Sequence, residues 1–497
     1  MNSTFKPALL LMGGRMVAFA ATFFIPVVLV RVFDQTEFGT YKQLFLVYAT
    51  LFGILQFGMA ESLYYFLPLG HRKGGRYTAN ALVSLAGAGI VGLALVVWKA
   101  PLIASWLGNG ALAAYLPALG VYVLLSVLSV TLEIIMTSRQ QFFTTAASYA
   151  ISEIVRAAAF IVPVLLTRQL EWLLVGVIAF AAARLAATVI YVFHEFGRDV
   201  FPHAAALREQ LVYALPFFGS SLLADWASQF HQYAVSHYFD TATFAIYAVG
   251  CMNIPLVELV HSPVGNVMMV RMAEYVKDRD DDAVLAIWND TTRKLALVFF
   301  PMLGFLLVSA REVIVFLFTS NYLASVPIFM IWSISVLLPV LQTDAVLRVY
   351  AETRFLLYAS AFKLAASVVF ILAFIRLFDV WGAALITLIV SFATKFICVA
   401  RFKHIAKVTL PELLPWKSLA ANAGVTAAAY AVTLLIKSQL QARTLVILMV
   451  TGTVFGVTYA ILALLAGVIS SDERQALVDS LQRIPVRLAK VGALLKD

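Results

Sequence analysis

The sequence predicts an all-α polytopic membrane protein with about fourteen transmembrane helices. Of its 497 residues, 62% are hydrophobic and 13% are charged, whereas soluble domains carry about 45–50% apolar and about 25% charged residues. The apolar residues also come in long runs: 78–98 and 442–469 each hold at most one charge. Runs of about 18 or more apolar residues indicate helices that cross a bilayer.

Breaks at charged residues, Pro and Gly separate these runs. The first run is too long for the core of a signal peptide and is not followed by a small-residue cleavage site, so we expect it to be retained as a helix. In chain order, the predicted spans are 8–30, 41–67, 78–98, 112–136, 146–167, 170–194, 210–238, 242–270, 291–318, 324–350, 355–376, 381–400, 416–437 and 442–469.

The distribution of basic residues predicts that both termini lie in the cytoplasm. With the amino terminus inside, 23 of the 36 Lys and Arg residues lie on the cytoplasmic side, 8 on the external side and 5 within spans. Cytoplasmic loops of membrane proteins carry an excess of Lys and Arg. The net charge of +9 is therefore explained by topology and is not an argument for nucleic-acid binding.

A short motif recurs at an offset of 206 residues. The pattern Phe33-Asp34-x-x-x-Phe38-x-x-Tyr41 returns as Phe239-Asp240-x-x-x-Phe244-x-x-Tyr247, each copy just after the first helix of a six-helix set. An even number of spans per copy leaves both copies in the same orientation, with a pseudo-twofold axis along the membrane normal. We therefore expect two six-helix lobes with a cleft between them.

The repeat and the loop lengths give four predicted parts. Residues 1–205 form an amino-terminal six-helix lobe and 206–405 a carboxyl-terminal one. Two additional transmembrane helices follow at 406–470, and 471–497 forms a cytoplasmic amphipathic tail. Every loop is too short to bury a core of its own, so we expect the function to reside within the bilayer.

Eleven of the charged residues inside predicted spans are candidates for a buried role. Each costs about 2.5–3.5 kcal/mol at the bilayer centre on insertion scales, so they are expected to face one another or a hydrated cavity. They are Arg15, Glu61, Glu133, Glu153, Arg156, Arg184, Asp225, Glu258, Asp344, Lys363 and Lys395.

These charges have a functional interpretation. Guanidinium groups bind phosphate bidentately, and ammonium groups bind it as point charges. Carboxylates near the midplane are suited to bind H⁺ or Na⁺, the possible coupling ions; no other cofactor is expected. The predicted headgroup-binding residues are Arg15, Arg156, Arg184 and Lys363. The predicted ion-coupling or cavity carboxylates are Glu61, Asp225 and Glu258.

Structural explanations stand beside this one. Glu153 and Arg156 are three residues apart on one helix and could satisfy each other. Arg184 and Asp225 could form a structural pair between helices. Three histidines on apolar helices, of which His231 is one, are more often hydrogen-bonded core residues than proton carriers.

The opening of each half resembles a known family. Gly14-Arg15 through Leu29-Val-Arg31-Val-Phe-Asp34-x-x-Glu37-Phe-Gly39-x-Tyr41 is similar to the start of polysaccharide biosynthesis (Wzx-type) flippases of the multidrug/oligosaccharidyl-lipid/polysaccharide exporter (MOP) superfamily. The segment from Ala214-Leu-Pro216-Phe to Tyr247 resembles the opening of that family's second half. His231 stands where the family often carries an acidic residue, and Asp34 stands where it carries Gly.

The resemblance implies a flippase that is not an enzyme. It implies two lobes around a cationic cavity that move polyprenyl-pyrophosphate-linked oligosaccharide to the outer leaflet by alternating access, for O-antigen or exopolysaccharide assembly. It also implies a bacterial inner membrane location, and membrane lipids and other polysaccharide-assembly proteins as partners. Arg15 and Arg31 share the sixteen-residue spacing of lipid II flippases.

Two other functions stay open at this point. One is a membrane-embedded polymerase or glycosyltransferase of the same pathway, which would be expected to need larger polar loops. The other is a small-molecule or drug antiporter, which would be expected to need an anionic pocket. Walker, GxSxG and HExxH motifs do not occur in the sequence.

Overall fold

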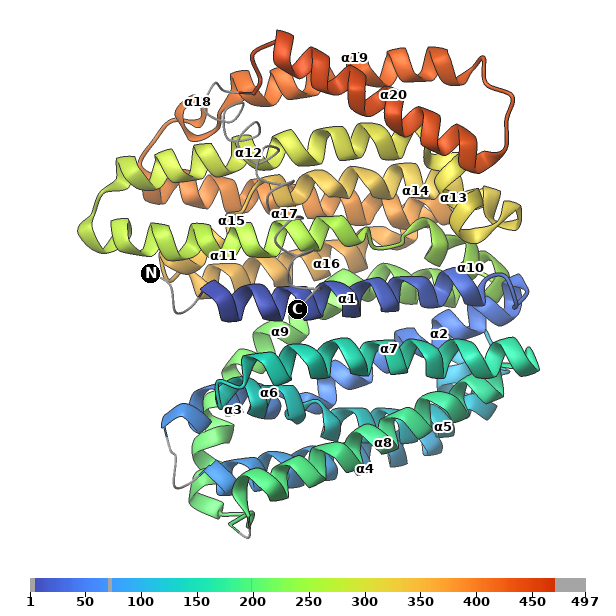
Figure 1. Cartoon of the computed structure of the whole chain (residues 1–497), viewed down its shortest axis with the longest axis vertical. Helices are drawn as coiled ribbons and strands as arrows, with labels where there is room; N and C mark the ends of the chain where they lie inside the picture. The colour runs from blue at the N-terminus through green and yellow to red at the C-terminus, as the bar shows by residue number, and fades with distance from the viewer. Residues whose placement is uncertain (1–4, 70–73, 198, 470–497) are drawn as a thin grey trace, which may run out of the picture. The chain divides into compact units, whose positions relative to one another are not determined.

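The computed structural model describes residues 5–69, 74–197 and 199–469. Within its helices, the side chains of 5–12, 14, 15, 17, 18, 216, 217 and 220 are not described, so the side chain of Arg15 lies outside the described residues. The predicted amphipathic tail lies outside them as well. All regular secondary structure in the described ranges is helical, as Figure 1 shows.

Nine helices cover the amino-terminal half. They are α1 (Phe5–Leu29), α2 (Gln35–Gln56), α3 (Met59–Leu69), α4 (Gly74–Trp106), α5 (Leu112–Ser129), α6 (Thr131–Ser138), α7 (Phe142–Thr167), α8 (Leu170–Phe196) and α9 (Ala204–Tyr238).

The rest of the described chain forms eleven α-helices and two 3₁₀ segments. They are α10 (Thr241–Gly250), α11 (Pro255–Asp278), α12 (Asp281–Val308), α13 (Ala310–Phe318), η1 (Ser320–Ser325), α14 (Val326–Ser333), η2 (Ile334–Val340), α15 (Thr343–Val349), α16 (Thr353–Phe378), α17 (Val380–Ala406), α18 (Leu410–Leu413), α19 (Trp416–Lys437) and α20 (Thr444–Leu465).

The predicted membrane spans correspond to these helices. Among the described residues, 11 helical segments are long and apolar enough to cross a membrane, and the bent pair α10–α11 makes up to 12. The two other predicted spans fall on α1 and α9, both of which contain residues outside the described side chains. The predicted all-α membrane fold is confirmed.

Several predicted spans are broken helices. One break separates α2 from α3, where Phe57 and Gly58 have φ of 32° and 75°. Another separates α10 from α11, which are bent by 49°. Irregular backbone at membrane depth is tolerated where protein buries it or where it lines a cavity, so such breaks are places to look for function.

The described chain divides into two compact units. The first contains the described residues up to Leu259 with Leu317–Trp332 and Glu352–Ile397, and the second contains Val260–Phe316, Ser333–Ala351 and the described residues from Cys398 onward. These boundaries do not coincide with those of the predicted lobes. The division at 205 and 405 therefore stays a prediction.

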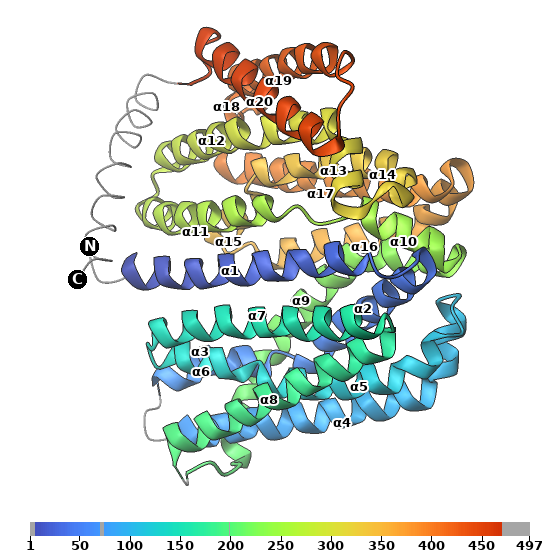
Figure 2. The same ribbon diagram turned by 45° about the vertical axis from the view of Figure 1, so that its right-hand side comes forward.

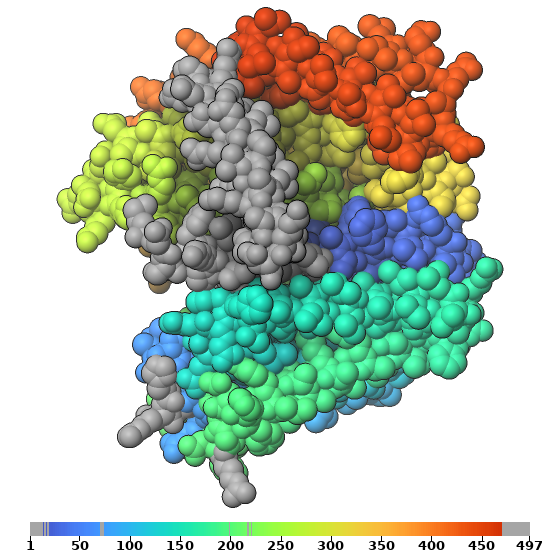
Figure 3. Space-filling view, viewed as in Figure 1, coloured from blue at the N-terminus to red at the C-terminus, as the bar shows by residue number. Residues whose placement is uncertain are grey.

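In the first unit, α1 and α7 pack against each other along their length. Figures 1 and 2 show the two helices side by side, and Figure 3 shows their surfaces in contact. A second core gathers α9, α10, α14, α16 and α17 around fully buried Val235, Phe244 and Tyr247. The first helix is therefore fixed to the helix that carries Glu153 and Arg156.

In the second unit, α19 and α20 pack on α12. Gly304 of α12 faces Thr426 and Phe455 at a distance that leaves no room for a Cβ atom. The Lys437 Nζ donates to Glu312 Oε2 and to the Val308 carbonyl, both at 2.6 Å. A largely buried ion pair thus fastens the end of α19 to the region where α12 ends.

Candidate functional site

Arg184 forms an ion pair with Glu133. Arg184 lies on α8 and its Nη2 is 2.6 Å from Glu133 Oε2 on α6, while Ser148 Oγ of α7 donates to Glu133 Oε1 at 2.9 Å. The Glu133 side chain is 2% exposed. Because an isolated carboxylate is costly at this depth, the guanidinium and the hydroxyl stabilise it. The pairing of Arg184 with Asp225 that the sequence suggested is wrong, because the partner of Arg184 is Glu133.

Arg156 and Glu153 form an ion pair on α7, as their spacing predicts. Thr22 of α1 joins them: its hydroxyl donates to Glu153 Oε2 at 2.9 Å and accepts from Arg156 Nη2 at 2.9 Å. The Arg156 side chain is still 23% exposed. A guanidinium that is held by one carboxylate of its own helix has donors left for another anion.

Aromatic residues lie near this ion pair. Tyr48 of α2 stacks on Tyr122 of α5 with ring centroids 4.8 Å apart, and Phe45 lies 5.0 Å from Phe160 of α7. Arg156 interacts electrostatically with the hydroxyls of Tyr48 and Tyr122. Polar hydroxyls on rigid rings next to a guanidinium suit a phosphate or sugar ligand.

Glu61 lies at the break between α2 and α3. It is in the first turn of α3 and half-buried, and its Oε2 has no hydrogen-bond partner among the described residues. Carboxylates are favoured at helix N-termini because of the helix dipole. The neighbouring Gly58 packs on the Ala214 carbonyl of α9, where an added Cβ would lie 2.9 Å away.

Asp225 and Glu258 are the two other predicted carboxylates. Asp225 is exposed on α9 with its Oδ2 facing Gly53 of α2, and Glu258 is exposed in the first turn of α11. Neither has an ion-pair partner among the described side chains. The same holds for Glu61, so none of the three predicted carboxylates is paired with a described side chain.

Lys363 lies on α16, half-buried and within electrostatic range of His231 on α9. The His231 ring is 2% exposed, and its Nδ1 is 2.7 Å from the Tyr247 hydroxyl. Trp332 packs on the same imidazole at 4.9 Å. His231 is therefore a hydrogen-bonded core residue, and Lys363 lies on a different helix from Arg156 and Arg184.

The sequence did not predict a buried network of hydrogen bonds around Gln43 in the first unit, called the polar seam below. Gln43 Nε2 donates to the Leu107 carbonyl at 2.9 Å and to Ser236 Oγ at 2.8 Å, and Gln43 Oε1 accepts from Asn109 Nδ2 at 2.7 Å. Asn109 also donates to Thr40. These residues come from α2, the turn after α4, and α9. The signal that could have revealed these contacts is the amide side chain of Gln43 in an otherwise largely apolar predicted span.

The seam continues through the loop between α1 and α2. Arg31 Nη1 donates to the Leu317 carbonyl at 2.8 Å, and Gln35 Nε2 donates to the Asn321 carbonyl at 2.6 Å. Gly39 approaches Thr241 so closely that an added Cβ would lie 2.1 Å from the Thr241 carbonyl oxygen. Both copies of the repeated motif thus meet at the predicted external ends of their helices.

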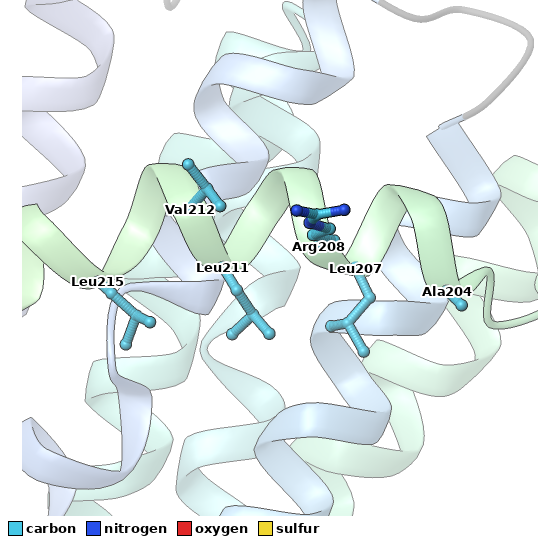
Figure 4. Close-up of a pocket in the computed structure, with 6 residues that line it drawn as sticks. All are labelled: Ala204, Leu207, Arg208, Leu211, Val212 and Leu215. Atoms are coloured by element: carbon cyan, nitrogen blue, oxygen red, sulfur yellow. The ribbon is translucent and has the colours of Figure 1, made fainter.

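The described pockets lie elsewhere. A pocket of about 440 Å³ follows α9, where Leu207, Leu211 and Leu215 project from the same side of the helix (Figure 4). A second, on the same helix, adds Tyr65 and Tyr213. No predicted site residue lines either of these pockets. Within the covered ranges, no group of three or more His, Cys, Asp or Glu residues could hold a metal ion.

The chain matches the family model of polysaccharide biosynthesis proteins over residues 28–327, which is more than half of its length. The chain belongs to this family. The resemblance of its two opening segments to polysaccharide biosynthesis proteins is thereby confirmed. No match was found among curated protein sequences.

Solved structures show the fold of this family member. The lipid II flippase MurJ in an inward closed conformation matches with a TM-score of 0.70 at 13% identity, over 91% of this chain and 99% of that chain. A multidrug resistance MATE family transporter of the MOP superfamily, inward-facing, matches at 0.63 and 12% identity, over 78% of this chain and 94% of that chain. A MOP superfamily transporter from Pyrococcus furiosus matches at 0.55 and 14% identity, over 81% and 95%.

Proposed function

We propose that this polysaccharide biosynthesis protein is a flippase. Its substrate is a polyprenyl-pyrophosphate-linked oligosaccharide, which it moves from the cytoplasmic to the outer leaflet by alternating access for O-antigen or exopolysaccharide assembly. The family assignment and the fold shared with lipid II flippase MurJ support this. The MurJ match covers 91% of the chain and the MATE match covers 78%. The lipid flippase is therefore the better guide to the function of this chain.

The observation that carries the proposal is the arrangement of Arg156 and Arg184. Each guanidinium lies inside the membrane-spanning part of α7 or α8 and is held by one carboxylate. A diphosphate offers more acceptor oxygens and a higher charge than a carboxylate, so it can bind the guanidinium donors that Glu153 and Glu133 leave free. Arg15 and Lys363 complete the proposed headgroup-binding set.

The three predicted carboxylates have no ion-pair partner among the described side chains, which suits them to ion coupling. Protonation or Na⁺ binding at Glu61, Asp225 or Glu258 removes an uncompensated charge from the membrane. An inward-moving cation contributes about 2.3 kcal/mol per 100 mV of membrane potential. Either ion would link the electrochemical gradient to the conformational cycle.

The direct test is transport by purified protein in liposomes. A fluorescent polyprenyl-pyrophosphate sugar is loaded into one leaflet, and its protection from a membrane-impermeant quencher is followed. We expect Arg156→Gln to slow translocation about tenfold or more, because a hydrogen bond to a charged group is worth about 1.5–3 kcal/mol. Arg376→Gln, at an exposed position near the end of α16, is the matched control.

Other outcomes would replace the proposal. Unchanged translocation in both Arg156→Gln and Arg184→Gln would remove the headgroup role of these residues. Sugar transfer by the purified protein would favour a polymerase or glycosyltransferase. Export of organic cations without movement of the lipid-linked sugar would favour a drug antiporter.

We also propose that the protein resides in the bacterial inner membrane with both termini in the cytoplasm. The 23-to-8 distribution of Lys and Arg supports this orientation. Protease digestion of tagged termini in inverted and right-side-out vesicles tests it. Cleavage of either tag from the external side would contradict the orientation.

A further inference from the structure

A basic pocket lies where α17 ends. It has a volume of about 510 Å³ and is lined by Ala400, Lys403, His404, Lys407 and Val408. Two of these side chains are cationic and a third can be protonated, and none is acidic. The sequence places this turn on the cytoplasmic side, whereas the predicted headgroup residues lie within the spans.

The basic side chains of this pocket are unengaged. Lys403, His404 and Lys407 are exposed and make no hydrogen bond or ion pair with any described residue. The nearest carboxylate along the chain, Glu412, accepts 2.8 Å hydrogen bonds from the Thr409 N–H and hydroxyl. These hydrogen bonds lower the pKa of Glu412 and hold it in a capping box, so it does not neutralise the pocket.

The backbone on both sides of the pocket is anchored to α12. Trp288 Nε1 donates to the Leu413 carbonyl at 2.9 Å, and Asn289 Nδ2 donates to the Glu412 carbonyl at 3.3 Å. Buried Phe402, one residue from Lys403, packs on the Trp288 ring at 5.1 Å. The three basic side chains therefore project from a fixed backbone, which lowers the entropy cost of binding.

The connector next to the pocket has features of a membrane–water interface. Trp416 is 46% exposed and its Nε1 donates to the Leu410 carbonyl at 3.1 Å, while the Leu410 side chain is 45% exposed. Tryptophan is enriched at bilayer interfaces, where an apolar ring and a polar N–H are both accommodated. Exposed apolar groups beside unpaired cations fit a ligand with a charged head and a hydrocarbon tail.

We propose that this pocket binds the phosphate headgroup of an anionic phospholipid of the cytoplasmic leaflet. Lys403, His404 and Lys407 contact the phosphate, and Trp416 and Leu410 contact the glycerol and upper acyl chain. Basic pockets near helix ends on the cytoplasmic side are suited to such lipids. The bound lipid fixes the corner between α17 and α19, and with it the start of the two carboxyl-terminal helices.

The test measures phosphatidylglycerol binding to the detergent-purified full-length chain by native mass spectrometry and by the lipid-dependent shift of the unfolding temperature. We expect binding to weaken about fivefold for each lysine removed. Lys407→Gly is the most informative variant. Lys407 has a φ of 53°, a conformation that glycine adopts without strain, so this change removes the charge without destabilising the turn.

Lys417→Gln is the matched control, because Lys417 is exposed on the first turn of α19 and does not line the pocket. Equal weakening by Lys417→Gln and Lys407→Gly would overturn the site in favour of diffuse attraction between positive charge and the membrane. Full competition by inorganic phosphate would show a free-phosphate site, and preference for the polyprenyl-pyrophosphate sugar would show a substrate site. Phosphatidylglycerol binding that only the pocket variants weaken would support the proposal.

Discussion

The two copies of the repeated motif begin in the same way and then diverge. Asp34 caps α2 by accepting from the Glu37 N–H at 2.8 Å, and Asp240 caps α10 by accepting from the Thr243 N–H at the same distance. In the first copy, the Glu37 carboxylate also accepts from the Asp34 N–H. The shared aspartate therefore fixes where each helix starts.

The side chains after the caps serve different purposes. In the first copy, Gln43 makes a hydrogen-bonded seam with α9 and the turn after α4. Its counterpart in the second copy is Val249, which is 1% exposed. In the second copy, Tyr247 instead contacts His231. The residue that corresponds to His231 in the first half is Ile25.

This difference predicts which part of the contact between the two copies can open. Hydrogen-bonded amides can exchange their partners for water at little net cost, whereas buried apolar side chains lose their hydrophobic stabilisation when exposed. We therefore expect the seam around Gln43 to separate in the transport cycle and the core around Tyr247 to stay intact.

The largest effect on stability is expected where the two copies of the repeated motif contact each other. Gly39→Val places a Cβ 2.1 Å from the Thr241 carbonyl oxygen, and we expect the free energy of unfolding to fall by about 3 kcal/mol or more. Thermal unfolding in detergent measures this. Gly456→Ala in α20, with no atom within 4 Å of the added Cβ, is the control. An unchanged unfolding temperature in Gly39→Val would refute the close contact.

The second prediction replaces Gln43 of the first copy with valine, the residue at the corresponding position of the second copy. Gln43→Val removes one hydrogen-bond partner each from Asn109 and Ser236, at a cost of about 1–3 kcal/mol. Asn109 keeps its bond to Thr40, and Ser236 keeps its bond to the Leu107 carbonyl. Hydrogen exchange should therefore speed up several-fold in the turn at 107–111. Gln56→Val is the control, because Gln56 bonds only to the Phe52 carbonyl of its own helix. Equal protection in both variants would mean that Gln43 does not hold the seam together.

The smallest effect on stability is expected at the aspartate cap that both copies of the motif share. Asp34→Ala and Asp240→Ala each remove a cap and should lower the free energy of unfolding by about 1 kcal/mol. Asp240→Ala should be the more costly, since in the first copy the hydrogen bond from the Asp34 N–H to Glu37 survives the substitution. Denaturation of both variants, compared with Asp34→Asn, measures the difference; the reverse order would contradict the capping geometry.

Local rules made part of the candidate site predictable. The spacing of Glu153 and Arg156 gives an ion pair on one helix, and the structure confirms it. The partner of Arg184 was not predictable in this way. Glu133 is 51 residues away in sequence, and which of several buried carboxylates it meets depends on how α6 and α8 are rotated as they pack.

By itself, the sequence determined that this is a helical membrane protein and where the capped helices α2 and α10 begin. Apolar runs of this length are stable only in lipid, and an aspartate before a helix satisfies free N–H groups from a few residues away. Only the tertiary structure decided that Gln43 meets Asn109 and Ser236, and that His231 meets Tyr247. Such contacts join segments distant in sequence, so they depend on packing that no local pattern encodes.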